Sequence, residues 1–187
     1  MKATEFPRSP LAPQPTEVQM CWLGQGALDH LCQYPCGWWI KALEEADLAM
    51  NRTVESKNKA LVLEAFDTLF NKRNYAAAEK FWSPHYIQHS AHIAPGREGL
   101  FDLIKSLPPT LKYEHGTIVG EGDFVIVHGR FSNFGLPVNW IAADIVRIKD
   151  GVLVEHWDVI QDEATQEQSK SGQPMFGRTF ATYASAR

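Results

Sequence analysis

The stretch from residue 140 to residue 161, WIAADIVRIKDGVLVEHWDVIQ, constrains the fold more than any other part of the sequence. Two arms rich in Val and Ile flank Asp150-Gly151, and an Asp-Gly pair between such arms predicts a β-hairpin. Three groups that can hold or move protons interrupt these arms: Asp144, His156 and Asp158. Such groups in a half-buried strand are exposed, paired or in use, because burying a charge without a partner is costly.

The turn decides which face of the hairpin carries these groups. A type I turn with a glycine bulge pairs Asp144 with His156. A two-residue turn instead places Asp144 opposite Trp157, because a one-residue slip moves every side chain to the other face. We favour the bulged turn, which gathers Asp144, His156 and Asp158 on one face with five apolar residues: Val146, Ile148, Val152, Val154 and Ile160. An apolar wall with a few convergent polar groups is typical of a small-molecule pocket.

An alternative interpretation needs no site. In it, Asp158 lies in water at the end of the strand and His156 is a hydrogen-bonded histidine of the core.

The remaining pattern predicts helices first and strands afterwards. Apolar residues at helical spacing predict helices over residues 57–71, 75–82 and 96–107, with a short extended segment at 86–89. Strand patterns follow at 111–119, 123–133, 137–149 and 152–160. This order predicts an α+β domain with an antiparallel sheet over residues 51–187. Residues 1–50 are expected to be a poorly ordered or loosely packed extension, because they begin with a Pro-rich stretch and have an irregular pattern.

Composition excludes several classes of partner. A net charge of −4 and a pI near 6.0 give no reason to expect nucleic acid or an anionic membrane as a partner. No apolar run approaches the ~20 residues of a membrane span, and the N-terminus lacks the pattern of a signal peptide. The odd set of Cys21, Cys32 and Cys36 does not form a disulfide framework. A cytoplasmic location is therefore expected.

The hairpin resembles the C-terminal hairpin of the SnoaL-like polyketide cyclases, within the NTF2-like superfamily. The resemblance continues through YIQH at 86–89, GREG at 96–99 and GDFVIVHGRF at 122–131. Downstream, Pro174-Met175-Phe176 resembles the tail of SnoaL-like proteins described as predicted aldol-condensation enzymes. The resemblance covers about residues 55–178. It implies a cone in which three helices line one side of a curled sheet and enclose a cavity.

The resemblance also implies chemistry. In SnoaL-like cyclases an Asp deprotonates an activated carbon, without a cofactor, and the enolate closes a ring. Asp158 directly follows Trp157 here, whereas the cyclases carry their Asp a few residues further on, where this chain has Gln161 and Asp162. We therefore expect generic acid–base catalysis, with Asp158 or Asp144 as the base.

The partner of this base is expected to be His156 or His89. In SnoaL-like proteins the segment that matches YIQH runs along the cavity mouth, so the resemblance implies the same place for residues 86–89. We expect His89 rather than Tyr86 to point inward. The expected substrate-binding residues are Tyr86, Phe124, His128, Trp140 and Val146. A metal site is not expected, because His85, His89 and His92 lack a further ligand at suitable spacing.

The sequence thus predicts a cofactor-independent aldol cyclase, isomerase or dehydratase acting on a small hydrophobic carbonyl compound. The alternative is a non-catalytic module for small-molecule binding or dimerisation. A homodimer is expected through the second face of the hairpin, which carries Ile145, Trp157 and Val159.

Overall fold

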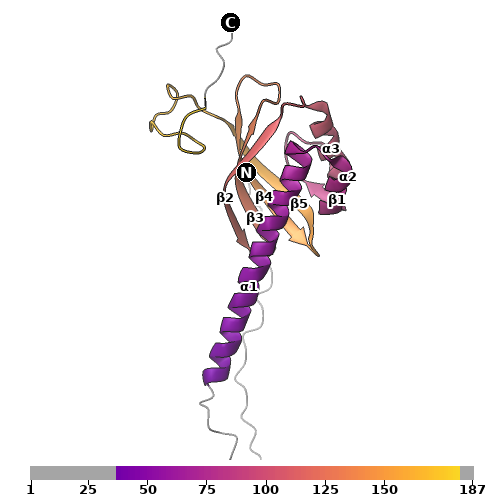
Figure 1. Ribbon diagram of the computed structural model, residues 1–187, viewed down its shortest axis with the longest axis vertical. Coiled ribbons are helices and arrows are strands. Elements are labelled where there is room, and N and C mark those ends of the chain that lie inside the picture. Colours follow the sequence, from indigo (N-terminus) through magenta and orange to yellow (C-terminus); the bar gives the residue numbers. More distant parts are fainter. Residues whose placement is uncertain (1–36, 182–187) are drawn as a thin grey trace, which may run out of the picture. The chain divides into compact units, whose positions relative to one another are not determined.

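The computed structural model describes residues 37–181 (Figure 1). Contacts divide the chain into two compact units, residues 1–40 and 41–187, and the fold below is that of the second unit. The cysteines and most of the expected N-terminal extension lie outside the described residues. The domain boundary expected at residue 50 stays a prediction, although one helix runs continuously across it.

Three helical segments come first and four long strands come last, as the sequence predicts. The elements are α1 (Gly37–Phe66), a π-helical turn (Asp67–Asn71), α2 (Tyr75–Ala78), a 3-10 turn (Glu79–Phe81), β1 (Trp82–Gln88), α3 (Gly96–Ser106), β2 (Lys112–Glu121), β3 (Phe124–Ser132), β4 (Trp140–Lys149) and β5 (Val152–Asp162). The helix expected over residues 57–71 is the C-terminal part of α1 together with the π-helical turn.

Hydrogen bonds from side chains fix the helix ends. The side chain of Asn74 accepts a hydrogen bond from the Ala77 N–H and so caps α2. The guanidinium of Arg73 donates to three carbonyls at and just after the C-terminal end of α3, those of Ile104 (2.7 Å), Leu107 (3.1 Å) and Pro108 (3.2 Å). Because helix C-termini leave carbonyls without partners, Arg73 both ends α3 and connects it to the turn before α2.

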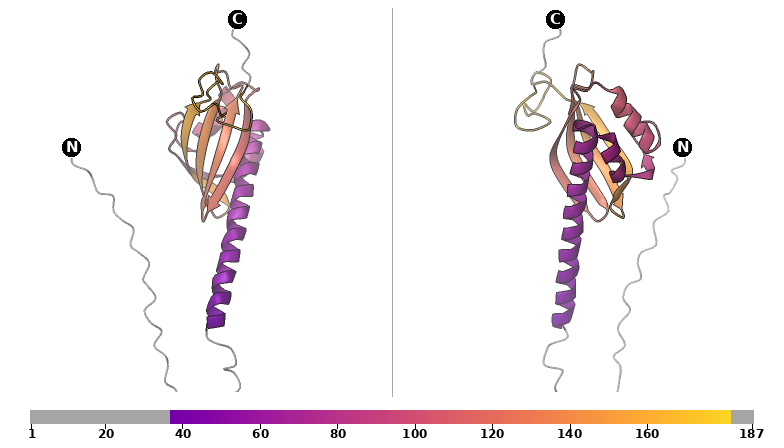
Figure 2. Two further views of the ribbon diagram at one scale, coloured as in Figure 1. Left: turned by 90° about the vertical axis from the view of Figure 1, so that its left-hand side faces the viewer. Right: turned by 45° about the vertical axis from the view of Figure 1, so that its right-hand side comes forward.

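The five strands form one curled sheet in the order β1-β5-β4-β3-β2. Strands β2 to β5 pair with one another in antiparallel fashion, while β1 pairs with β5 in parallel at one edge. Figure 2 shows the curl of the sheet, with the C-terminal part of α1, α2 and α3 on its concave side. This arrangement confirms the predicted α+β class with three helices against a curled sheet, and adds a parallel edge strand.

The turn of the last hairpin differs from the prediction. Lys149 pairs with Val152, so only Asp150 and Gly151 form the loop. Both have positive φ, 51° and 76°. Positive φ at both central residues defines a type I′ turn, which suits the twist of the flanking strands. The expected three-residue turn is therefore wrong.

A β-bulge further along β5 compensates for the shorter turn. Leu153 pairs with Ile148 and Glu155 with Arg147, so Val154 is an extra residue without a partner on β4. An extra residue in one strand shifts all later pairs by one position. The side chains after the bulge consequently return to the face that the longer turn would give them.

The faces of the hairpin follow from this combination. Asp144 lies opposite Asp158, and His156 lies opposite Val146, so the expected direct pairing of Asp144 with His156 is wrong. The expected inner positions of Val152 and Val154 are also wrong, because the fully buried Leu153 faces the core instead. The two carboxylates and His156 nevertheless share the concave face of the sheet.

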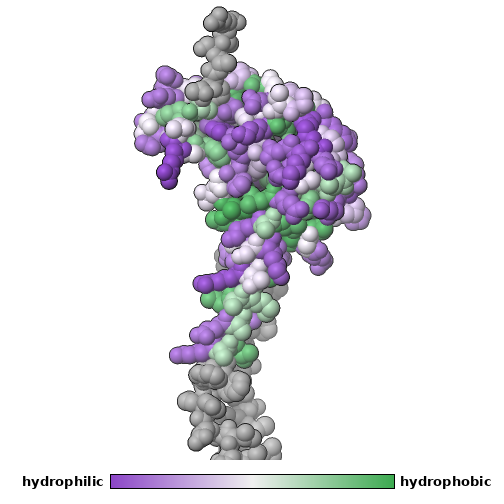
Figure 3. Space-filling model, in the orientation of Figure 1, coloured by the Kyte–Doolittle hydropathy of each residue, from purple (hydrophilic) through white to green (hydrophobic). Residues whose placement is uncertain are grey.

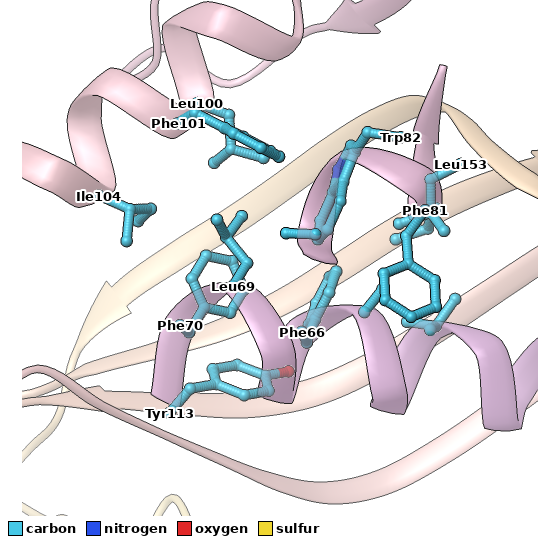
Figure 4. Packing of buried hydrophobic residues seen from close by; sticks show 14 of the residues in the cluster. Phe66, Leu69, Phe70, Phe81, Trp82, Leu100, Phe101, Ile104, Tyr113 and Leu153 are labelled. Carbon is cyan, nitrogen blue, oxygen red and sulfur yellow. The ribbon is translucent and has the colours of Figure 1, made fainter. Parts of the chain in front are cut away.

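Aromatic side chains dominate the core between the helices and the sheet (Figure 4). The ring of Phe66 on α1 lies 5.1 Å from Phe70 and stacks on Trp82 at 6.4 Å. Trp82 in turn meets Phe101 of α3 edge to face at 5.6 Å. These contacts fix the C-terminal part of α1 and α3 over the sheet, because buried aromatic pairs add to the stabilisation that their area provides.

Residues 40–54 of α1 are exposed, among them Leu43, Leu48 and Met50. Figure 3 shows hydrophilic and hydrophobic side chains mixed along this part of the helix. Among the described residues, no helix has the length and apolar character needed to cross a membrane.

Candidate functional site

An apolar cavity lies between the concave face of the sheet, the end of α1, and α3. It holds about 620 Å³ of space, its open mouth included. Aromatic residues from four parts of the chain make up much of its wall: Phe66, Phe70, Phe131, Phe134 and Trp140. Aliphatic residues of α3 and of the segments that flank it complete this wall.

Seven of the described lining residues have polar side-chain atoms: Tyr86, Ser90, His92, Trp140, Asp144, His156 and Asp158. Two are carboxylates and none is Lys or Arg, so none of the described residues that line the cavity carries a permanent positive charge. An apolar wall with few polar groups suits a small organic ligand.

Asp144 and His156 form a buried pair. Their exposed fractions are 4% and 5%, and 3.2 Å separates His156 Nε2 from Asp144 Oδ1. The hydroxyl of Tyr113 donates to the second oxygen, Asp144 Oδ2, over 3.4 Å. Both carboxylate oxygens therefore have partners, which a buried carboxylate requires.

The second ring nitrogen of His156 is also occupied. His156 Nδ1 lies 2.9 Å from Gln88 Oε1. The same oxygen accepts a hydrogen bond from the Ser90 N–H over 2.9 Å. Because both nitrogens of His156 bind side chains of the protein, the imidazole has no free nitrogen for a ligand.

Asp158 differs from its neighbours. It is half-buried and lines the cavity, directly across the strands from Asp144. Within residues 37–181, no hydrogen bond or ion pair engages its carboxylate. Asp158 is therefore the acidic group of the cavity that remains available to a ligand.

Two buried tyrosines stay protonated beside these carboxylates. Burial raises the pKa of the Tyr86 hydroxyl above its ordinary value, and the negative charges of Asp144 and Asp158 raise this pKa further. Burial also raises the pKa of Tyr113, and so do its Coulomb interaction and hydrogen bond with Asp144. Both side chains are consequently hydroxyl donors at any physiological pH.

His89 lies outside the cavity, so the prediction that it points inward is wrong. Its ring stacks on Trp157 with centroids 4.7 Å apart, and its Nε2 lies 2.9 Å from Glu155 Oε1. The inward residues of this segment are instead Tyr86, which lines the cavity, and Gln88, which contacts His156. Residues 86 and 88 share a face because side chains alternate along a strand.

Of the other expected binding residues, one lines the cavity and three do not. Trp140 lines the cavity, with its ring 5.3 Å from His92. Val146 is completely buried in the core and does not line the cavity. Phe124 is 43% exposed, and the ring of His128 packs against Phe176 of the C-terminal segment.

Sequence reasoning missed Gln88 and Tyr113. Gln88 carries no signal of its own, because it becomes an inner residue only if Tyr86 does. Gly129 provides a signal for Tyr113, since a glycine inside a strand often marks a close approach of another group. A Cβ at Gly129 would lie 2.6 Å from Tyr113 ring atoms, so the tyrosine occupies the space that glycine leaves.

In the described part of the chain, no three or more His, Cys, Asp or Glu side chains are grouped so that they could hold a metal ion.

The curled sheet, the helices on its concave side and the enclosed cavity together define an NTF2-like cone. The family model described as a SnoaL-like domain matches residues 62–156, just over half of the chain. The protein therefore belongs to the SnoaL-like domain family, as its hairpin predicts.

The chain is similar to several solved structures. A proposed ketosteroid isomerase from Kribbella flavida is 15% identical, with a TM-score of 0.51 over 57% of this chain and 79% of that chain. AclR, a proposed hydroxylase from Streptomyces galilaeus, is 27% identical, with a TM-score of 0.47 over 57% and 80%. A proposed polyketide cyclase from Acidithiobacillus ferrooxidans is 18% identical, with a TM-score of 0.49 over 56% and 88%. A comparison with curated proteins finds no match.

Proposed function

We propose that this protein is a cofactor-independent acid–base enzyme that acts on a small hydrophobic carbonyl compound, with Asp158 as the base. The observation that carries the proposal is the free carboxylate of Asp158 in an apolar cavity. Asp144 and His156 are bound to each other and to further side chains, so they are positioned to support Asp158 rather than to contact the substrate.

The reaction begins with a proton transfer. Asp158 takes a proton from the carbon next to the substrate carbonyl, and the electron pair of that C–H bond moves to the carbonyl oxygen as an enolate. Tyr86 lines the same cavity and remains a hydroxyl, so it can donate a hydrogen bond to this oxygen. Return of the proton to another atom gives an isomerase, and attack of the enolate on a second carbonyl gives a cyclase.

Hydrogen exchange tests the proton transfer without knowledge of the natural substrate. The full-length protein is incubated in D₂O with a panel of uncharged cyclic ketones and 1,3-diketones, and NMR follows the loss of the hydrogens next to the carbonyl. Asp158→Asn should slow catalysed exchange about 10²- to 10⁴-fold, the usual contribution of a positioned base. Asp162→Asn is the matched control, because Asp162 is exposed at the end of β5 and does not line the cavity.

A non-catalytic binding module is the second candidate, which the mostly apolar cavity wall favours. Trp140 in this wall gives a fluorescence signal for ligand binding. Quenching by ligands without hydrogen exchange above the Asp158→Asn level would support the binding module and contradict the enzyme.

We also propose that the domain forms a homodimer through the convex face of the sheet. Several apolar side chains are exposed on the sheet strands, among them Val159 (68%), Val119 (51%), Phe124 (43%) and Ile126 (41%). Contiguous exposed apolar residues often mark an interface. Sedimentation should give a dimer for the wild type and a monomer for Val159→Lys, and a monomeric wild type would contradict the proposal. The cytoplasmic location expected from the cysteine content remains a prediction.

A further inference from the structure

The orientation of the Gln88 amide is fixed by the backbone. A peptide N–H can only donate, so the amide atom that faces the Ser90 N–H at 2.9 Å must be the oxygen. The opposite orientation would point an NH₂ group at this N–H and leave Ser90, which is only 8% exposed, without an acceptor. The present orientation leaves Gln88 Nε2 without a partner among the described residues, and the Ser90 contact outweighs that cost.

The proton positions on His156 follow from this orientation. The same Gln88 oxygen lies 2.9 Å from His156 Nδ1, and because that oxygen can only accept, Nδ1 carries a proton. His156 Nε2 faces Asp144 Oδ1 at 3.2 Å. If Nε2 also carries a proton, the pair is imidazolium and carboxylate. If Nε2 carries a lone pair, Asp144 must be the protonated partner.

Both alternatives place one proton between Nε2 and Oδ1, and both give the pair of Asp144 and His156 a net charge of zero. The arrangement with a neutral imidazole protonated on Nε2, beside an ionised carboxylate, would have a net charge of −1. It requires a bare Nδ1, and a bare Nδ1 would face the lone pairs of the Gln88 oxygen.

We propose that Gln88 is a positioning residue that holds His156 with a proton on Nδ1 and thereby keeps the pair of Asp144 and His156 neutral. This inference deepens the proposed function, because it leaves Asp158 as the one net charge among the described residues that line the cavity. Asp158 lies directly across the strands from Asp144, and like charges in such a pair destabilise each other.

The other groups around this cluster do not change the charge balance. Tyr86 from β1 and Tyr113 from β2 stay as neutral hydroxyls. His92 lines the cavity and packs on Trp140, and within residues 37–181 no Lys or Arg side chain lines the cavity. A neutral pair therefore places no net negative charge beside the carboxylate of Asp158, which remains available as the base.

Nitrogen NMR of the full-length protein labelled with ¹⁵N-histidine tests the inference directly. The chain has seven His, and the signals missing in His156→Gln identify those of His156. At neutral pH we expect a protonated Nδ1 that exchanges slowly with solvent. A neutral imidazole with its proton on Nε2 and a bare Nδ1 would overturn the inference. This outcome is independent of catalysis, so it remains distinguishable from a failure of the proposed function.

Substitutions at Gln88 provide a second test. Gln88→Glu keeps oxygen acceptors and should retain the protonated Nδ1, whereas Gln88→Leu should lose it. Gln161→Leu is the matched control, because Gln161 is exposed and does not line the cavity. An unchanged His156 spectrum in Gln88→Leu would overturn the inference, and the wild-type and Gln88→Glu spectra decide the matter if Gln88→Leu does not fold.

The kinetic consequence applies to any compound found active in the exchange assay. In Gln88→Leu the acidic limb of the pH–rate profile should move to higher pH, because Asp158 then faces an ionised Asp144. Gln161→Leu should leave the profile in place. A profile for Gln88→Leu that coincides with that of the wild type would contradict the positioning role even if the rate itself falls.

Discussion

Replacement of Asp144 measures how strongly the buried pair depends on its hydrogen bonds. Asp144→Leu removes both oxygens at a position that is 4% exposed, and leaves His156 Nε2 and the Tyr113 hydroxyl without acceptors. Removal of one partner from a buried pair lowers the free energy of unfolding by about 3–5 kcal/mol. A domain of this size loses about 2–4 °C of Tm per kcal/mol, so the Tm should fall by roughly 10 °C.

Asp144→Asn should be much milder, because an amide can satisfy both neighbours. Its oxygen can accept from the Tyr113 hydroxyl, and its NH₂ can donate to Nε2 when His156 is neutral with its proton on Nδ1. The remaining loss is that of one weakened hydrogen bond, about 1 kcal/mol, which corresponds to roughly 3 °C. The order of the two variants thus follows from the proton positions and not from the size of the side chain.

Urea denaturation at pH 7, followed by circular dichroism, gives both free energies, and calorimetry gives the Tm values. Asp162→Leu and Asp162→Asn are the controls, because Asp162 is exposed at the end of the same hairpin. An Asp144→Leu variant as stable as the wild type would show that the pair is not held by these hydrogen bonds. Equal losses in the Leu and Asn variants would refute the proton positions.

Three further predictions concern other parts of the domain. Arg73→Met removes three hydrogen bonds to the C-terminal end of α3 and should lower the free energy of unfolding by about 3 kcal/mol, at about 1 kcal/mol each; an unchanged urea midpoint would contradict this. Gly129→Ala places a methyl group 2.6 Å from Tyr113 ring atoms and should cost about 1–3 kcal/mol in the same assay. The pKa of Glu155 lies below its ordinary value of 4.5, and the hydrogen bond with His89 is the largest cause. The ionised carboxylate therefore stabilises the fold fully above pH 4.5, and this stabilisation is lost as the pH falls through the lowered pKa. Glu155→Gln should therefore lower the Tm at pH 7, and the difference from the wild type should shrink as the pH falls below 4.5; a difference that stays constant would refute the assignment.

The sequence predicted the elements of the fold because their signals are local. Helical spacing around Phe66 and Leu69, the Asp150-Gly151 turn and the Val-rich strands each depend on neighbouring residues. Which side chains of β1 point into the cavity depends on residues far away in the sequence. The side chains of residues 86–89 alternate between the two faces, but neither set is clearly apolar, so the sequence does not indicate which set points inward. Only the pairing with β5 places Gln88 beside His156 and puts His89 on the opposite face.

The register of the hairpin shows a different limit. Asp150-Gly151 fits both turn types, and Val154 has none of the features, such as Gly or Pro, that usually mark a bulge. Asp144, His156 and Asp158 therefore share one face of the sheet, although the predicted turn and the predicted inner positions of Val152 and Val154 are wrong. Two one-residue shifts, one in the turn and one in the bulge, add to a shift of two residues beyond Val154. Because side chains alternate between faces, a shift of two residues changes the partners and restores the face.

Charge explains why the chain adopts the bulge in place of a regular hairpin. With the observed turn and no bulge, Glu155 would lie opposite Val146, on the face where Val146 is completely buried. His156 would move to the convex face, leaving Asp144 without its partner. An uncompensated buried carboxylate costs several kcal/mol, and the regular register would create two of them.

With the bulge, the Glu155 carboxylate instead meets the guanidinium of Arg147 and the ring of His89. Disruption of the strand pairing at Val154 costs less by comparison, about 1–3 kcal/mol for an unpaired backbone group. The acidic and basic residues of this hairpin thus select the register that its hydrophobic pattern and turn leave open, and the same selection brings Asp158 to the cavity.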